Sequence, residues 1–319
     1  MEPIGPQDVA TGGNAQTAMS APSLQAMHWS VKPRCHFLLF AALTSLACDS
    51  SPSSDVLPGP GGGAATATAV GGAAAGGASS SEGAGGLSGR FELAWQDDFD
   101  SVDLNRWQLM THSWDGNVAQ FTASNATTDA GILSLALTSE PTDTTKPYRG
   151  VEMRSLDTLT YGKVEASVRF ASGSAVVSSL VLLYTPWPPP DWNELDIEFL
   201  GMNTDRIQFN HMINIPPADP ATGHLQYPAM VTLDMNPSEG FHTYTIEWVP
   251  GAARFSIDGV VLHTATEEMA RMVLPQNILL TIWASSSAGW AGPIDDTTAP
   301  TSVDYDWIKV YAYVDETAG

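Results

Sequence analysis

Short runs of alternating apolar and polar residues fill the chain from about residue 90 onward. In KVEASVRF (163–170) and FHTYTIEWV (241–249), every second side chain is apolar, which is the period of a strand with one buried face. Turn residues separate the runs, and Asp258-Gly259 between two apolar stretches predicts a hairpin. Further runs of this kind lie at 132–139, 175–185, 254–264, 277–285 and 302–314.

This pattern predicts an all-β domain. The one segment with a helical pattern is ATEEMARM (265–272), which is short, and the strands show no internal repeat. Regular short strands over this length favour a two-sheet β-sandwich of the jelly-roll type. We expect this domain to span residues 90–316.

The N-terminal part of the chain has a different composition. From Met27 to Cys48 the sequence is MHWSVKPRCHFLLFAALTSLAC, in which Lys32 and Arg34 precede an apolar run of about 12 residues. A membrane-spanning helix needs about 20 residues. We therefore predict a leader and signal peptide over 1–48, with translation starting at Met27. Cys48 resembles the lipidated cysteine of a bacterial lipoprotein, and a plain signal peptide that releases the protein is the alternative.

Residues 49–89 are rich in Gly, Ala, Ser and Pro, with almost no large apolar side chain. Such a segment buries too little surface to offset the loss of chain entropy on folding. We predict a disordered linker that tethers the β domain. The protein is thus expected to be exported, either as an outer-surface lipoprotein or as a secreted bacterial protein.

Charge and composition narrow the ligand class. The chain has 35 acidic and 13 basic residues, a net charge of −22, which disfavours nucleic acid as a partner. Ten tryptophans, ten phenylalanines and eight tyrosines suit a cleft for a neutral ligand as well as a core. Two cysteines cannot form a disulfide scaffold. The sequence contains neither a phosphate-binding glycine-rich loop nor an HExxH zinc motif.

The segment DWNELDIEFLG (191–201) carries the candidate chemistry. With a period of two, Trp192, Glu194, Asp196 and Glu198 share one face, and the opposite face is apolar. Adjacent acids without a basic partner are costly unless the face is solvated or the acids are functional. A solvated outer face is the simpler interpretation, but a tryptophan beside carboxylates is typical of a sugar-binding surface.

The two glutamates have the reach that a glycosidase requires. Their Cα atoms lie ~13 Å apart on an extended strand, but long side chains can lean together over a concave sheet. Carboxyl groups about 5 to 5.5 Å apart are typical of retaining glycosidases, and about 6.5 to 9.5 Å of inverting ones. Asp196 would lie between Glu194 and Glu198 and could influence the ionisation of both.

The motif NELDIEFLG resembles the catalytic strand of glycoside hydrolase family 16, and within that family it is most similar to the bacterial lichenases, which are β-1,3-1,4-glucanases. The motifs VEMRS (151–155), YGKVEASVRF (161–170), FHTYTIEWVPG (241–251) and YDWIKVY (305–311) occur in the order of that family. The resemblance implies a concanavalin A-like jelly roll with a concave substrate cleft. It also implies a retaining endo-β-glucanase with Glu194 as nucleophile, Asp196 as assisting acid and Glu198 as general acid/base.

The same resemblance implies a set of substrate-binding residues, and three of these residues also have a structural explanation. The implied set is Trp192, Tyr184, Glu152, Arg154, Gln208, Asn210 and Trp283. For Glu152 with Arg154 the alternative is an ordinary ion pair, and for Trp283 it is core packing. Asp306 matches a position that binds structural calcium. No cofactor is otherwise expected, and we expect a monomer that acts on a polysaccharide.

Some positions depart from the lichenase pattern. Thr281 replaces a cleft asparagine and Met212 a cleft tyrosine, whereas all three acids are present. The active strand lacks the extra residue that forms a bulge in most laminarinases, which favours mixed-linkage glucan as substrate. Two alternatives stay open: a transglycosylase acting on β-glucan or xyloglucan at the same site, and a non-catalytic carbohydrate-binding module.

Overall fold

A computed structural model describes residues 90–185, 192–213 and 225–315. The leader, Cys48 and the linker predicted over 1–89 lie outside the described residues. Within those residues, no helix has the length and apolar character required to cross a membrane.

Two antiparallel sheets form the domain. In hydrogen-bonding order, the first contains β4 (Ala126–Asp129), β5 (Ile132–Ser139), β17 (Thr301–Val314), β7 (Gly162–Arg169), β13 (His242–Val249), β14 (Ala252–Ile257) and β15 (Val260–Ala265). The strand β1 (Arg90–Asp97) pairs with the C-terminal half of β17. This long last strand therefore ties the start of the domain to its end.

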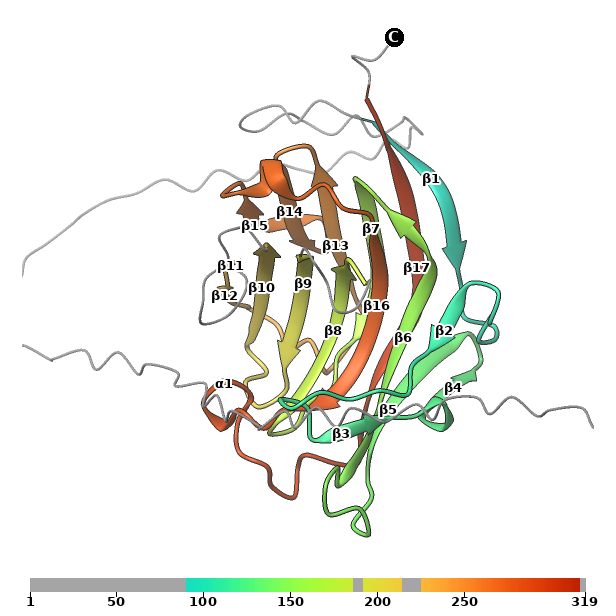
Figure 1. The fold of residues 1–319 in the computed structure, drawn as a ribbon, viewed down its shortest axis with the longest axis vertical. Helices are drawn as coiled ribbons and strands as arrows, with labels where there is room; N and C mark the ends of the chain where they lie inside the picture. The colour runs from blue at the N-terminus through green and yellow to red at the C-terminus, as the bar shows by residue number, and fades with distance from the viewer. Residues whose placement is uncertain (1–89, 186–191, 214–224, 316–319) are drawn as a thin grey trace, which may run out of the picture. The chain divides into compact units, whose positions relative to one another are not determined.

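The second sheet carries the acidic segment. Its order is β2 (Trp107–Leu109), β6 (Tyr148–Leu159), β16 (Gln276–Ala284), β8 (Val176–Leu183), β9 (Asn193–Leu200) and β10 (Arg206–Ile213). Both β11 (Leu225–Gln226) and β12 (Ala229–Thr232) pair with β10. Figure 1 shows β6, β16, β8, β9 and β10 side by side as a curved sheet. The start of β6 pairs with β3 (Ala119–Phe121) and β5, which joins the two sheets.

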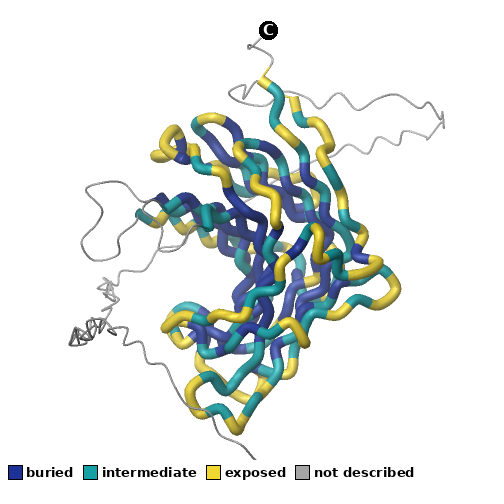
Figure 2. The backbone as a smooth tube through the Cα atoms, turned by 45° about the vertical axis from the view of Figure 1, so that its right-hand side comes forward, coloured by how far each residue is buried: buried dark blue, intermediate teal, exposed yellow. Residues whose placement is uncertain are grey.

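The core lies between the sheets. Aromatic rings from facing strands pack together there: Phe209 of β10 stacks on Phe255 of β14 with ring centroids 5.2 Å apart. Phe199 of β9 stacks on Phe170 at 5.6 Å. The most deeply buried backbone follows this interface (Figure 2). Burial of these large apolar side chains is the main stabilising contribution to the fold.

The predicted all-β sandwich is confirmed, and so is the hairpin at Asp258-Gly259. Ile257 pairs with Val260 across the turn, and both turn residues have positive φ angles, 49° and 78°, as a type I′ hairpin requires.

The predicted helix at 265–272 is wrong. Only Met269–Arg271 form a turn of 3-10 helix, η2, because Glu268 before it has a left-handed backbone with φ of 56°. The described part also contains a 3-10 turn, η1 (Ala123–Asn125), and one short α-helix, α1 (Ala288–Ala291). The sequence pattern did not predict α1, because four residues are too few to show a helical period.

Candidate active site

The strand β9 has two chemically different faces. Leu195, Ile197 and Phe199 are fully buried in the core. Glu194, Asp196 and Glu198 point to the opposite face, which we call the carboxylate face of the second sheet. Asp196 is 1% exposed, whereas the two glutamates are partly exposed. The structure therefore has the alternation predicted from DWNELDIEFLG, with the apolar side chains in the core and the acids on the other face.

Strand register brings distant polar residues into line with Glu198. Gln208 of β10 and Ser179 of β8 pair directly with Glu198. Thr281 of β16 pairs with Ser179, and Glu152 of β6 pairs with Thr281. Directly paired residues point to the same side of a sheet. These five side chains therefore form one row across the carboxylate face.

A second row passes through Asp196. Asn210 of β10 and Val181 of β8 pair with it, and Leu279 and Arg154 continue the row on β16 and β6. The register thus places the predicted Glu152, Arg154, Gln208 and Asn210 on the same face as the acids.

Glu194 receives a hydrogen bond from the tryptophan that precedes β9. The Trp192 indole Nε1 donates to Glu194 Oε2 at 2.6 Å. Burial, together with the smaller effect of the Glu152 charge, raises the pKa of Glu194 to about 7, and the Trp192 hydrogen bond and the interaction with Asp196 act in the opposite direction.

Glu198 has a different donor. Gln208 Nε2 donates to Glu198 Oε2 at 2.9 Å. Burial, followed by the charge of Glu194, raises the pKa of Glu198 to about 8, and the Gln208 hydrogen bond acts in the opposite direction. The two glutamates therefore have separate partners and separate electrostatic environments.

Asp196 lies between the two glutamates and below them. Neither of its carboxyl oxygens has a partner at hydrogen-bond geometry among the described residues. Burial, the charges of Glu194 and Glu198, and its interaction with Glu194 all raise the pKa of Asp196 well above its usual range. A protonated aspartic acid at this position can donate a hydrogen bond to a neighbouring carboxylate.

Glu152 and Arg154 form the ion pair that was the alternative to a sugar-binding role. The Arg154 guanidinium donates through Nε and Nη2 to Glu152 Oε1, with the Nε contact at 3.0 Å. His112 Nε2 lies 3.5 Å from Glu152 Oε2. Glu152 is only 3% exposed, so Arg154 compensates a buried charge on the carboxylate face.

Of the remaining candidates, Trp283 is the most informative. Leu280 and Ile282 of β16 are fully buried in the core, and Trp283 alternates with them toward the carboxylate face, partly exposed. Trp283 therefore lies outside the main core and packs against a small second cluster of buried residues, Val177, Leu200 and Ala291. Its ring centroid lies 5.1 Å from that of Trp114 and 5.9 Å from that of Trp290. Trp114, Trp283 and Trp290 therefore form an aromatic cluster at the second sheet, which also carries the acids.

Two further candidates have backbone partners. Asn210 is buried, and its Oδ1 accepts a hydrogen bond from the backbone N–H of Tyr227 at 3.1 Å. Tyr184 is partly exposed just after β8, and its backbone N–H donates to the Asn193 carbonyl at 2.9 Å.

Sequence reasoning missed Trp114, Trp290 and Ser179. Trp290 Nε1 donates to Gln208 Oε1 at 3.0 Å, and Ser179 Oγ lies 2.6 Å from Thr281 Oγ1. The abundance of tryptophan was the only available signal for the indoles, because their partners come from segments far away in the sequence.

Asp306, the predicted calcium ligand, lies at an irregularity in β17 between Tyr305 and Trp307. Its Oδ2 accepts a hydrogen bond from Ser167 Oγ at 3.4 Å. Among the described residues there is no group of three or more His, Cys, Asp or Glu side chains that would hold a metal ion. A calcium ion held there largely by backbone carbonyls stays a prediction.

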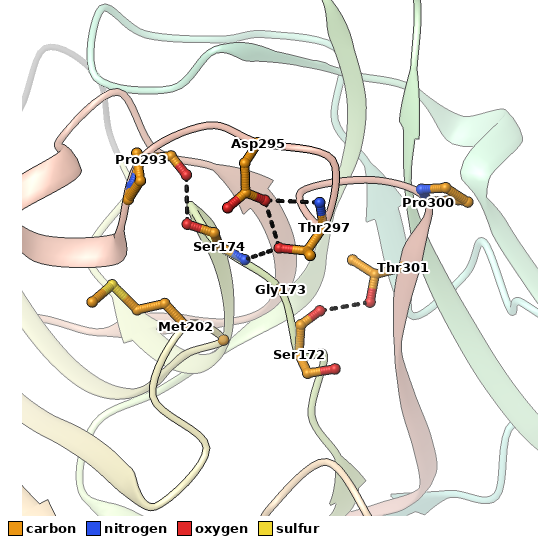
Figure 3. Close-up of a pocket in the computed structure, with 10 residues that line it drawn as sticks. Ser172, Gly173, Ser174, Met202, Pro293, Asp295, Thr297, Pro300 and Thr301 are labelled. Atoms are coloured by element: carbon orange, nitrogen blue, oxygen red, sulfur yellow. Dashed lines mark hydrogen bonds between the residues drawn. The ribbon is translucent and has the colours of Figure 1, made fainter.

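A pocket of about 560 Å³ lies away from the acids, where β8 begins and β9 ends (Figure 3). Asp295 Oδ1 accepts hydrogen bonds from Thr297 N and Oγ1 at 2.7 and 2.6 Å, and these bonds lower its pKa. Ser174 Oγ donates to the Pro293 carbonyl. Because these polar groups bond to one another, we interpret them as holding the loops 172–174 and 293–301 together.

A β-sandwich with two glutamates in different environments and a buried aspartate on one strand, near partly exposed indole rings, defines a glycoside hydrolase. The family model of the glycosyl hydrolases family 16 matches residues 111–309, and the chain belongs to this family. The resemblance expected from NELDIEFLG is thereby confirmed.

Individual relatives agree with this assignment. A beta-glucanase of Brevibacillus brevis is 32% identical over 222 residues, which cover 68% of this chain and 81% of that protein. A beta-glucanase of Bacillus subtilis (strain 168) is 30% identical over 217 residues, or 67% of this chain and 84% of the relative. The solved structure of a prokaryotic β-1,3-1,4-glucanase (lichenase) derived from a mouse hindgut metagenome superposes with a TM-score of 0.60 at 28% identity, covering 69% of this chain and 99% of that one.

Proposed function

We propose that this protein is a retaining endo-β-glucanase that hydrolyses internal bonds of mixed-linkage β-1,3-1,4-glucan. The observation that carries the proposal is the pair Glu194 and Glu198, which share one face of β9 but have different hydrogen-bond donors and pKa values of about 7 and about 8. Two carboxyl groups with separate environments can divide the roles of nucleophile and acid/base.

In the first step, the Glu194 carboxylate attacks the anomeric carbon while Glu198 donates its proton to the leaving glycosidic oxygen. The C–O bond breaks, and an ester between Glu194 and the sugar forms. In the second step, water attacks the same carbon, Glu198 takes the proton of that water, and Glu194 leaves as a carboxylate. Asp196, buried between the two, stabilises Glu194 when it carries charge, because the interaction with Asp196 lowers the pKa of Glu194.

The substrate assignment rests on the relatives and on the regularity of β9. Relatives with about 30% identity carry the name beta-glucanase, and one of the similar solved structures is a lichenase. The strand β9 pairs with both of its neighbours without a register shift. Residues 193–198 pair with β10, and residues 194–200 pair with β8. This regular pairing supports the mixed-linkage substrate, because laminarinases of the family typically carry an extra residue in this strand.

The test is a reducing-sugar assay on lichenan, barley glucan, laminarin, xyloglucan and agarose, with Glu194→Gln as the matched inactive control. We expect the fastest release from lichenan and barley glucan. Proton NMR of the first product should show the β-anomer before mutarotation, because two displacements restore the configuration. An α-anomer would contradict the retaining mechanism, and preference for laminarin would contradict the proposed linkage. If an oligosaccharide is added as acceptor, products longer than that oligosaccharide would indicate a transglycosylase.

A further inference from the structure

Two hydrogen bonds in series connect the surface helix α1 to Glu198. The Trp290 indole Nε1 on α1 donates to Gln208 Oε1 at 3.0 Å. The same amide donates from Nε2 to Glu198 Oε2 at 2.9 Å. Gln208 is 7% exposed, so little water is available to replace either bond.

The order of donors and acceptors fixes the orientation of the amide. An indole N–H can only donate, and a glutamine side chain has one accepting end and one donating end. Because Trp290 occupies the carbonyl oxygen of Gln208, the NH₂ group has to face Glu198. The opposite orientation would place two donors against each other at Trp290 and leave both unsatisfied.

We propose that Trp290 is a positioning residue for Glu198 and acts through Gln208, by fixing which end of the amide faces the carboxyl group. The inference rests on the proposed role of Glu198 as general acid/base. It adds to the proposed site a residue that lies outside the strand of the acids, since Trp290 is on α1, after β16.

The orientation favours the ionised form of Glu198. An amide NH₂ group stabilises a carboxylate, whereas a carbonyl oxygen would accept the proton of a neutral carboxyl group. The other groups of the surroundings are acidic or neutral: Glu194 and Asp196 on β9, Ser179 on β8, and Thr281 with Glu152 further along the row. The Arg154 guanidinium is held by Glu152. The Gln208 amide is therefore the principal group that opposes the raised pKa of Glu198.

Without the indole N–H, the amide can rotate when Glu198 is protonated. Its carbonyl oxygen then accepts the carboxyl proton, the neutral acid is stabilised, and the pKa of Glu198 rises. Trp290→Phe keeps an aromatic ring against Trp283 but removes the donor. In the pH profile of kcat/KM, we expect the alkaline limb to shift to higher pH by roughly half to one unit, because the free enzyme requires a protonated Glu198. Gln208→Met removes the amide and should give at least as large a shift.

A variant that combines Gln208→Met with Trp290→Phe shows whether Trp290 acts through Gln208 or has a direct or merely structural role. In a Gln208→Met background, Trp290→Phe should produce no further shift of the limb, because the group on which Trp290 acts is absent. Trp114→Phe is the matched control: it changes another indole of the same aromatic cluster and should leave the limb unchanged. A uniform loss of activity without a shift, or additive shifts in the double variant, would overturn the proposal.

A measurement independent of turnover keeps the proposal testable if the proposed activity fails. Carboxyl titration by ¹³C NMR with labelled glutamate, in which Glu198→Gln identifies the signal, gives the pKa of Glu198 directly. An upward shift in Trp290→Phe supports the positioning role even in a protein that cleaves no glucan. An unchanged Glu198 titration in Trp290→Phe would refute it, whatever the activity.

Discussion

Trp192, just before β9, and Glu194, two residues further along the chain, are joined by a 2.6 Å hydrogen bond from the indole Nε1 to the carboxylate Oε2. The tryptophan expected as a sugar-binding surface therefore also stabilises the charge of the proposed nucleophile. Its N–H opposes the effect of burial, which raises the pKa of Glu194 to about 7. A charged hydrogen bond of this kind contributes about 1.5 to 3 kcal/mol.

The first prediction concerns this bond. Trp192→Phe keeps an aromatic surface but removes the donor, so the pKa of Glu194 should rise. Because Glu194 has to be ionised to attack, the acid limb of the pH profile of kcat/KM should move upward, by about one pH unit. The loss should be near tenfold on the acid side and small on the alkaline side. An equal loss at every pH would show that Trp192 contributes to sugar binding alone.

The second prediction concerns the stability cost of the acids. Because burial and neighbouring charges raise the pKa of Asp196, the folded protein binds more protons than the unfolded chain above about pH 4. Its stability therefore falls as pH rises from that value toward the folded-state pKa values. Asp196→Asn removes this charge at nearly constant volume. We expect a higher Tm than wild type at pH 8, by several degrees, and little difference at pH 4.

The matched control is Asp304→Asn. Asp304 is also buried, but Arg169 Nη2 lies 2.5 Å from its Oδ2, so removing its charge should lower the Tm at pH 8. In catalysis, Asp196→Asn should slow both steps and leave the product configuration unchanged, since Asp196 touches neither the attacking nor the leaving atom. A lower Tm for Asp196→Asn at pH 8 would contradict the electrostatic cost.

Much of this site is visible in the sequence because strand periodicity is local. The alternation in NELDIEFLG assigns the acids to one face before any tertiary contact is known, and the structure places them there. The bond between Trp290 and Gln208 is different, because it depends on how the loop after β16 folds back over β10. The contact between Ser179 and Thr281 likewise depends on the register of β8 against β16, which no local pattern specifies.

The third prediction is that the domain beginning near residue 90 folds and acts alone. Every residue proposed for catalysis or substrate binding lies on strands of the second sheet or in adjacent loops, Asp306 lies on β17 of the first sheet, and the first described strand begins at Arg90. A chain beginning at Gly89 should retain the kcat/KM and Tm of the longer protein. A chain beginning at Ser101 is the control: it lacks β1, exposes the edge of β17, and should have a lower Tm. Loss of activity in the chain that begins at Gly89 would refute the predicted boundary.

The fourth prediction is that Cys48 is lipidated and retains the enzyme at the outer surface of a bacterial membrane. The apolar run before Cys48 is too short to span a bilayer, so attachment would depend on the acylated thiol. Wild-type protein should enter the detergent phase on Triton X-114 partitioning, and Cys48→Ser should shift to the aqueous phase. Partitioning of both into detergent would exclude the thiol as the anchor, and a wild-type protein found in the medium would indicate plain secretion.

The last prediction divides the roles of the two glutamates by the configuration of their products. Glu194→Ala should abolish glucan hydrolysis, but azide can enter the vacated space and attack an activated glucosyl substrate from the nucleophile's side, which gives a glycosyl azide of inverted configuration. Glu198→Ala should still form the ester on Glu194 when the leaving group needs no proton. Azide then displaces Glu194 from the opposite side, and the product keeps the original configuration. Proton NMR of the anomeric signals distinguishes the two products. Exchanged configurations would reverse the assignment of Glu194 and Glu198, and full activity in either alanine variant would exclude this strand as the catalytic one.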